Sequence, residues 1–126
     1  MDNLNSILIE GNLTHDPEFS YTPKGTAVCK FSIASHRTYK ESTGRKEETS
    51  YINITSWGKL AETCAEYLKQ GRGVRVVGRI KQERWNDSEG KLRSNIIIIA
   101  EHVEFKPSFK QKEEETIVER KIEEKG

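Results

Sequence analysis

The sequence predicts a mostly β domain with one helix, built as a five-stranded β-barrel in which three strands precede the helix and two follow it. Its 126 residues suffice for one domain and a short tail. Charged residues make up 33% of the chain and hydrophobic residues another 33%, so the core must be small. A barrel suits such a core better than a broad layered sheet. Segments of alternating hydrophobicity on both sides of one helical segment complete the prediction.

Three alternating segments precede the helix. We expect a first strand at residues 6–13 and, after a break, a short strand at residues 19–21. Residues 27–37 and 49–57 alternate between apolar and polar side chains and form the second and third strands. The intervening residues 40–48 are polar and have almost nothing to bury, which predicts a long, exposed hairpin loop.

The period changes at residues 59–69, where apolar residues recur at i, i+4, i+7 and i+8 from Leu60. This spacing predicts an amphipathic helix. Residues 72–85 and 92–105 form the fourth and fifth strands, and Gly78 marks a bulge or kink in the long fourth strand. Three strands, a helix and a two-stranded hairpin follow the order of the OB fold, with the helix closing one end of the barrel.

The OB domain is expected to occupy residues 1–105, followed by a charged, disordered tail at residues 106–126. No stretch approaches the roughly 20 apolar residues needed to cross a bilayer, and no secretory leader is recognisable. Cys29 and Cys64 lack metal-ligand spacing and are expected as reduced core residues. We therefore expect a cytoplasmic protein. Its net charge is +1, so a phosphate-binding surface must be a local stripe of cations.

Strand alternation predicts which aromatic residues face solvent. In the third strand, Ile52 and Ile54 share one face. The residues on the other, exposed polar face are therefore Tyr51, Asn53, Thr55 and Trp57. In the fourth strand, Val74, Val76 and Ile80 share the interior face. Trp85 lies on the opposite face, although a bulge at Gly78 would shift its register. Rings exposed among Lys and Arg side chains are what sequence-tolerant binding of single strands requires, because every base has a face that can stack.

Each of these residues also has a purely structural interpretation. Trp57, just before the helix, could plug the core, and Tyr51 could simply be a good strand former. Trp85 could clasp its hairpin, and the cations of the fourth strand could form a solvated face. Because alternation places several of the rings on the solvent-exposed face at once, we favour the interpretation that they bind single strands.

Three segments together carry a family resemblance. Residues 7–25 read ILIEGNLTHDPEFSYTPKG and residues 57–78 read WGKLAETCAEYLKQGRGVRVVG. The sequence RWND at residues 84–87 is followed by Gly90. Over residues 4–105 the chain resembles bacterial single-stranded DNA-binding proteins. The resemblance implies binding and protection of single-stranded DNA without sequence specificity during replication, recombination and repair. It also implies a homotetramer.

The resemblance also assigns roles to individual residues. The residues expected to stack on bases are Tyr39, Tyr51, Trp57 and Trp85. The family's phosphate contacts correspond to three residues of this chain, and strand alternation adds two cations of the fourth strand. The expected phosphate-binding residues are Lys40, Lys59, Arg84, Arg79 and Lys81.

The tail departs from the family pattern of a Gly/Pro/Gln-rich linker with an acidic tip ending in Pro-Phe. This sequence ends in Glu-Glu-Lys-Gly. We hypothesise that the chain coats single strands without the usual recruitment of repair and replication proteins.

Three alternative functions stay open. A primosomal OB dimer would bind single strands beside a helicase, and an OB module could instead bind structured RNA or an oligosaccharide. A metal-dependent nuclease would need clustered carboxylates. Asp16, Glu18 and Asp87 lie in separate turns, and the three histidines are scattered. We therefore predict no catalytic residue, no metal site and no cofactor.

Overall fold

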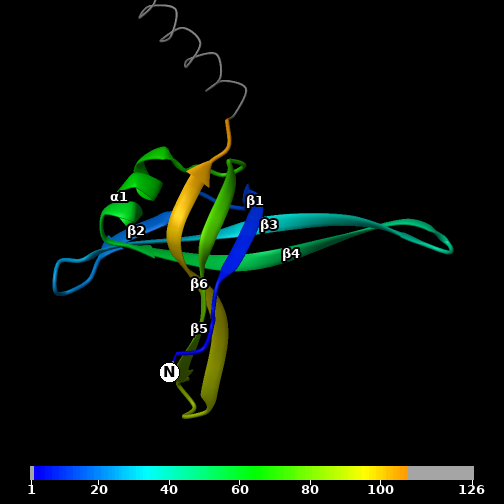
Figure 1. Cartoon of the computed structure of the whole chain (residues 1–126). Helices are drawn as coiled ribbons and strands as arrows, with labels where there is room; N and C mark the ends of the chain where they lie inside the picture. Colours follow the sequence, from blue (N-terminus) through cyan, green and yellow to red (C-terminus); the bar gives the residue numbers. More distant parts are fainter. Residues whose placement is uncertain (1, 108–126) are drawn as a thin grey trace, which may run out of the picture.

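The computed structural model describes residues 2–107, so all but the first two residues of the predicted tail lie outside the described part of the chain. The described part holds six strands and one helix (Figure 1). They are β1 (Ile7–Leu13), β2 (Glu18–Tyr21), β3 (Ala27–Glu41), β4 (Gly44–Trp57), α1 (Gly58–Tyr67), β5 (Gly73–Asn86) and β6 (Leu92–Phe105).

Five of the strands close into a barrel. The strand order is β1-β5-β6-β4-β3-β2, and an additional pairing of β1 with β3 closes the ring. The pair β4–β6 is parallel, and the other pairs are antiparallel. Strand β2 pairs only with β3 and lies outside the ring. The predicted five-stranded OB barrel with one helix is therefore confirmed, and the short strand expected at residues 19–21 is β2.

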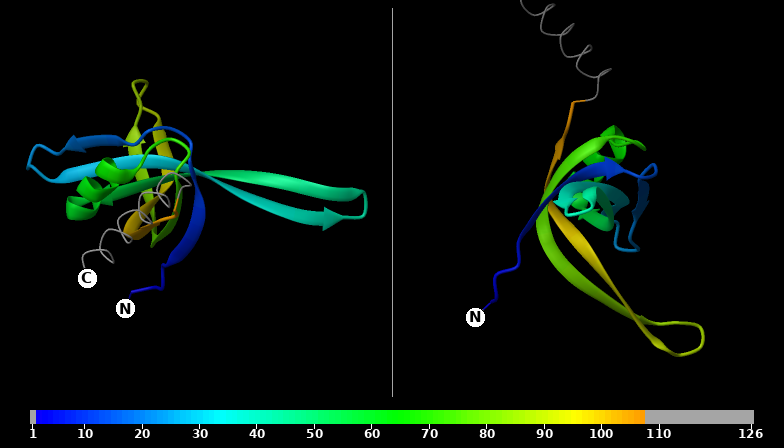
Figure 2. Two further views of the ribbon diagram at one scale, coloured as in Figure 1. Left: turned by 90° about the horizontal axis from the view of Figure 1, so that it is seen from above. Right: turned by 90° about the vertical axis from the view of Figure 1, so that its right-hand side faces the viewer.

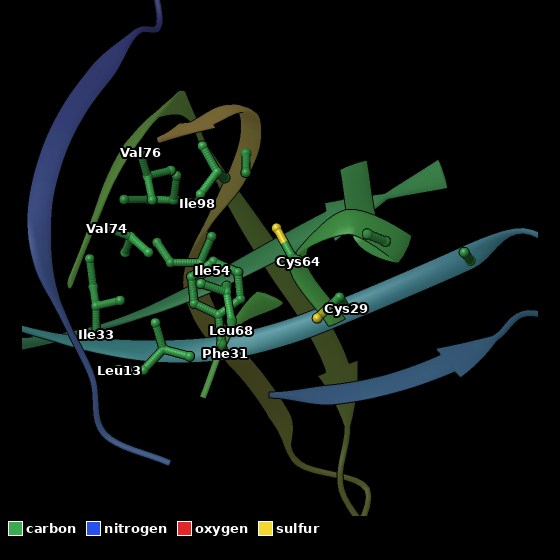
Figure 3. Packing of buried hydrophobic residues seen from close by; sticks show 14 residues of the cluster. Leu13, Cys29, Phe31, Ile33, Ile54, Cys64, Leu68, Val74, Val76 and Ile98 are labelled. Atoms are coloured by element: carbon green, nitrogen blue, oxygen red, sulfur yellow. The ribbon is translucent and has the colours of Figure 1, made fainter. Parts of the chain in front are cut away.

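The barrel interior is filled by one face of each of the five barrel strands (Figure 3). Phe31 and Ile33 of β3 face Ile54 of β4 and Val76 of β5, and all four are at least 95% buried. Cys29 and Cys64 lie fully buried in the same cluster, as the sequence predicts. Burial raises the pKa of the Cys29 thiol to about 11, so it stays protonated at neutral pH.

Helix α1 covers one end of the barrel, as expected. It begins directly after Trp57, at Gly58, whose φ of 65° lies in the region that glycine adopts most readily. Ala61 and Cys64 on its inner face, and Leu68 just after it, pack into the core. The helix ends at Tyr67, two residues earlier than predicted.

The exposed loop predicted at residues 40–48 is wrong. Strand β3 runs on to Glu41 and β4 begins at Gly44, so only Ser42 and Thr43 form the turn. The resulting hairpin projects far beyond the barrel (Figures 1 and 2). Both faces of the hairpin are exposed to solvent there, so its sequence carries no apolar alternation. The backbone hydrogen bonds between the two strands nevertheless continue. An ion pair at 3.3 Å joins Arg37 and Glu48 across this ladder.

The irregularity predicted at Gly78 is present, but the extra residue belongs to the opposite strand. Val77 pairs with His102 and Gly78 with Ala100, so Glu101 of β6 is left without a partner on β5. A Cβ atom at Gly78 would lie 2.1 Å from the carbonyl oxygen of Ile99. Gly78 is therefore needed because the backbone of β6 approaches β5 closely here.

The isoleucine run of β6 is mostly covered within a single chain. The sequence suggests that residues 96–99 need cover from the helix or from another subunit. Ile97, Ile98 and Ile99 are at least 93% buried in the monomer, whereas Ile96 is 62% exposed. Ile80, predicted to share the interior face of Val76, does share it but lies beyond the barrel and is 44% exposed.

The described chain ends where β6 leaves the barrel. Lys106, the first residue of the predicted tail, still donates its backbone N–H to Gly73. No helix within residues 2–107 is long and apolar enough to cross a membrane.

Candidate nucleic-acid interface

Four strands share a continuous outer face. The register aligns Lys30 of β3, Thr55 of β4, Ile99 of β6 and Arg79 of β5 in one row across the sheet. Because side chains alternate along a strand, the other members of this face follow at every second residue. On β4 they are Tyr51, Asn53 and Trp57; on β5 they are Lys81, Glu83 and Trp85; on β6 they are Arg93, Asn95 and Ile97.

Three of the four predicted stacking residues therefore lie on one face. Tyr51 is 73% exposed, Trp57 is 44% exposed and Trp85 is 48% exposed. Trp57 is absent from the core cluster, so the interpretation of this ring as a core plug is wrong. Because the bulge residue belongs to β6, the alternation along β5 is unbroken, and Trp85 keeps the face that the simple pattern predicts.

Tyr39 lies on the opposite face. It sits within β3, not beyond the end of a strand, and it shares the alternation of Phe31 and Ile33. Its ring is partly buried, with the guanidinium carbon of Arg37 5.3 Å from the ring centroid. A cation so placed is attracted to the ring face. The structure does not bring Tyr39 together with the other three rings.

The predicted phosphate-binding residues differ in their positions. Arg79 and Lys81 share the face of Trp85, and Lys40 shares the face of Tyr51. Lys59 is exposed in the first turn of α1, two residues after Trp57. Arg84 points to the other side of its hairpin, where it donates to Gln82 Oε1 at 3.1 Å.

All five of these cations are free of ion pairs within the described residues. By contrast, Arg75 contacts Glu10 at 2.7 Å, and Arg93 contacts Asp87 at 2.9 Å. A cation without a carboxylate partner can neutralise a phosphate without first breaking an ion pair. The five predicted residues are therefore available to a bound strand.

Asp87 fixes the turn that follows Trp85. Its Oδ1 accepts hydrogen bonds from the backbone N–H groups of Glu89 and Lys91, each at 2.9 Å. Its Oδ2 accepts a hydrogen bond from Nε of Arg93. The hydrogen bond from the backbone N–H of Lys91 is the largest cause that holds the pKa of the Asp87 carboxyl below its ordinary value. The hydrogen bond from the Arg93 guanidinium is the second. This turn positions the end of the hairpin that carries Trp85.

A cleft of about 460 Å³ opens in the shared face. The segment between β1 and β2 and the base of the β5–β6 hairpin form its walls, and β3 and β4 form its floor. Thr55, predicted to be exposed with its neighbours on this face, is instead 96% buried in the floor. The polar side chains that line it include Glu18, Ser32, Asn53, Thr55, Glu83 and Asn95.

A second groove, of about 520 Å³, lies between β1 and β3 where the two strands diverge. Leu8, Ser35 and Arg75 are among the residues that line it. No group of three or more His, Cys, Asp or Glu side chains in residues 2–107 is arranged to hold a metal ion.

The sequence pattern located the aromatic residues but missed the cleft. The one signal of it in the sequence is the alternation that places Asn53 and Thr55 on the polar face of β4. Nothing in the order of residues shows that Glu83 and Asn95 stand beside them, because that proximity depends on the parallel pairing of β4 with β6.

Comparisons with known proteins agree with this geometry. Residues 4–106 match the model of the single-strand binding protein family. A protein of Aquifex aeolicus named single-stranded DNA-binding protein is 43% identical over 101 residues, covering 79% of this chain and 68% of its own length. Proteins of the same name from Treponema pallidum and Deinococcus radiodurans are 38% and 41% identical. These two matches cover 83% and 80% of this chain, but only 59% of the Treponema protein and 34% of the Deinococcus protein.

Two solved structures share the fold. The single-stranded DNA-binding protein from Thermus aquaticus, in a deletion mutant, gives a TM-score of 0.75 at 26% identity, covering 84% of this chain and 52% of its own. A Plasmodium falciparum protein solved in complex with single-stranded DNA gives 0.78 at 22% identity, covering 85% of this chain and 98% of its own. The match over residues 4–106 and the 43% identity to the Aquifex aeolicus protein show that the chain belongs to the single-strand binding protein family, whose members bind DNA without catalysing a reaction.

Proposed function

We propose that this protein binds and protects single-stranded DNA without sequence specificity during replication, recombination and repair. The observation that carries the proposal is the placement of Tyr51, Trp57 and Trp85 on one face, from two different hairpins, on either side of a cleft. Stacking of a base on each ring contributes about 1–3 kcal/mol. Duplex DNA hides its base faces, so the surface selects single strands.

The cations complete the interface. Lys40, Arg79 and Lys81 surround the rings on the same face, and Lys59 follows Trp57. We assign Arg84 and Tyr39 to the same function, reached by a strand that wraps around the edges of the two hairpins. Each phosphate neutralised on a single strand changes the slope of log affinity against log salt by roughly −0.7.

A fluorescence titration tests the proposal, because Trp57 and Trp85 are the only tryptophans in the chain. We expect oligo-dT to quench the tryptophan fluorescence strongly and duplex DNA of equal length to quench it weakly. Part of the quenching by oligo-dT should remain at high salt. Tyr51→Ala should weaken the affinity for oligo-dT about 5- to 100-fold. Tyr21→Ala, an exposed tyrosine on the opposite face of the sheet, is the matched control and should leave it unchanged. An absence of quenching by oligo-dT would overturn the proposal.

We further propose that the protein is a homotetramer and acts in the cytoplasm, associated with the nucleoid. Along Ile7–Glu10, strand β1 pairs with β5 on one side only, within the described chain. Leu8 on this strand is 64% exposed and borders the second groove. A free strand edge beside an exposed apolar side chain favours pairing with another copy. Family membership favours this assembly over a primosomal dimer.

A further inference from the structure

The cleft between the aromatic residues has an electrostatic character that phosphate binding does not explain. Asp16, Glu18 and Glu83 line it, and Lys30 is the one Lys or Arg among its lining residues. Neither Glu18 nor Glu83 forms an ion pair within residues 2–107. A phosphate in the cleft would be repelled, so the sugar-phosphate chain must run outside it.

The floor of the cleft offers neutral groups that can form hydrogen bonds. Thr55 is 96% buried, yet its hydroxyl has no hydrogen-bond partner among the described residues, although it lines the cleft. Ser32 donates its hydroxyl to Oδ1 of Asn53, which leaves the Nδ2 amino group of Asn53 free to donate. A buried polar group without a partner is costly, and a ligand that pairs with it removes that cost.

One edge of the cleft accepts hydrogen bonds and the floor donates them. Glu83 is paired across the hairpin with Asn95, on the same face as Asn53 and Thr55, and its carboxylate can only accept. Cytosine presents an amino donor beside two acceptors, its ring nitrogen and its carbonyl oxygen. Thymine instead presents a carbonyl oxygen where cytosine has its amino group, and a carboxylate repels that oxygen.

We propose that this cleft holds one unstacked base of the bound strand and favours a base with an amino group, cytosine over thymine, through Glu83. The inference rests on the proposed function and deepens it. Binding remains tolerant of sequence elsewhere, where the rings stack on any base, and discriminates at this one position. Asn53 and Thr55 donate to the ring nitrogen and carbonyl oxygen of the base, and Glu83 accepts from its amino group.

The test compares the affinities of the full chain for oligo-dC and oligo-dT of equal length, at slightly alkaline pH and fixed salt. In Glu83→Gln, we expect the ratio of dC affinity to dT affinity to fall roughly fivefold, because the repulsion of thymine and the charged acceptor are both lost. Glu89→Gln removes the same charge from the exposed turn of the same hairpin and should leave the ratio unchanged.

A second variant tests the floor. Thr55→Val keeps the shape of the side chain and removes its hydroxyl, so affinity for both oligonucleotides should fall several-fold without loss of stability in urea. A ratio that is the same in Glu83→Gln and in the wild type overturns the assignment of base preference. An unchanged affinity in Thr55→Val overturns the floor contact. If the wild type binds neither oligonucleotide, the proposed function itself is wrong.

Discussion

Gly73 and Gly78 lie in the same strand and neither has a positive φ, yet their neighbours differ. A Cβ at Gly73 would meet Cδ and Cβ of Lys106 at 3.1 and 3.2 Å, contacts that a shift of a few tenths of an ångström relieves. A Cβ at Gly78 would meet a backbone oxygen at 2.1 Å, which cannot move away. The sequence predicts an irregularity from the glycine alone, but it does not reveal that the extra residue belongs to β6, because that depends on the pairing of two distant segments.

Gly78→Ala should therefore destabilise the fold by about 2–3 kcal/mol, since the barrel must open locally to admit a methyl group. Gly73→Ala adds the same atom to the same strand and should change stability by less than about 0.5 kcal/mol. Urea unfolding of both variants, read at the transition midpoint, gives the comparison. Equal losses in the two variants would show that strand propensity, and not the contact with Ile99, accounts for the glycine.

At the scale of elements, the β3–β4 hairpin shows what sequence patterns can and cannot predict. The part inside the barrel alternates, and the sequence located it correctly. The projecting part has polar side chains on both faces, so no apolar periodicity distinguishes it from a loop. Its register nevertheless decides which residues share a face, because it places Tyr51 and Tyr39 on opposite faces.

The opposite placement of the two tyrosines predicts a dependence on the length of the bound strand. An oligo-dT of about 6 nucleotides, near the lower limit for one OB fold, should bind only the face of Tyr51, Trp57 and Trp85. Tyr39→Ala should then change its affinity less than twofold, whereas Tyr51→Ala weakens it about 5-fold or more. With a strand long enough to wrap around the hairpin, Tyr39→Ala should also weaken binding. Equal effects of the two variants on the short strand would contradict the assignment of faces.

For the whole molecule, the sequence predicts the barrel, the helix that caps it and the exposure of Tyr51, Trp57 and Trp85. These depend on local alternation, which each segment carries by itself. The cleft and the closure of the ring do not follow from any one segment. They depend on the β1–β3 and β4–β6 pairings, which join residues far apart in the chain. The side chains that we assign to base preference could therefore be found only in three dimensions.

The free edge of β1 and the exposed Leu8 beside it lead to a prediction about assembly. Light scattering coupled to size-exclusion chromatography should give a mass four times the 14.5 kDa of one chain. Leu8→Lys places a charge beside that edge and should shift the mass toward smaller species, because a buried lysine must be desolvated. Leu92→Lys alters an equally exposed leucine, 69% against 64%, at the end of the β5–β6 hairpin and should leave the mass unchanged. A wild-type mass equal to one chain would contradict the tetramer. An equal effect of the two substitutions would place the contact elsewhere than β1.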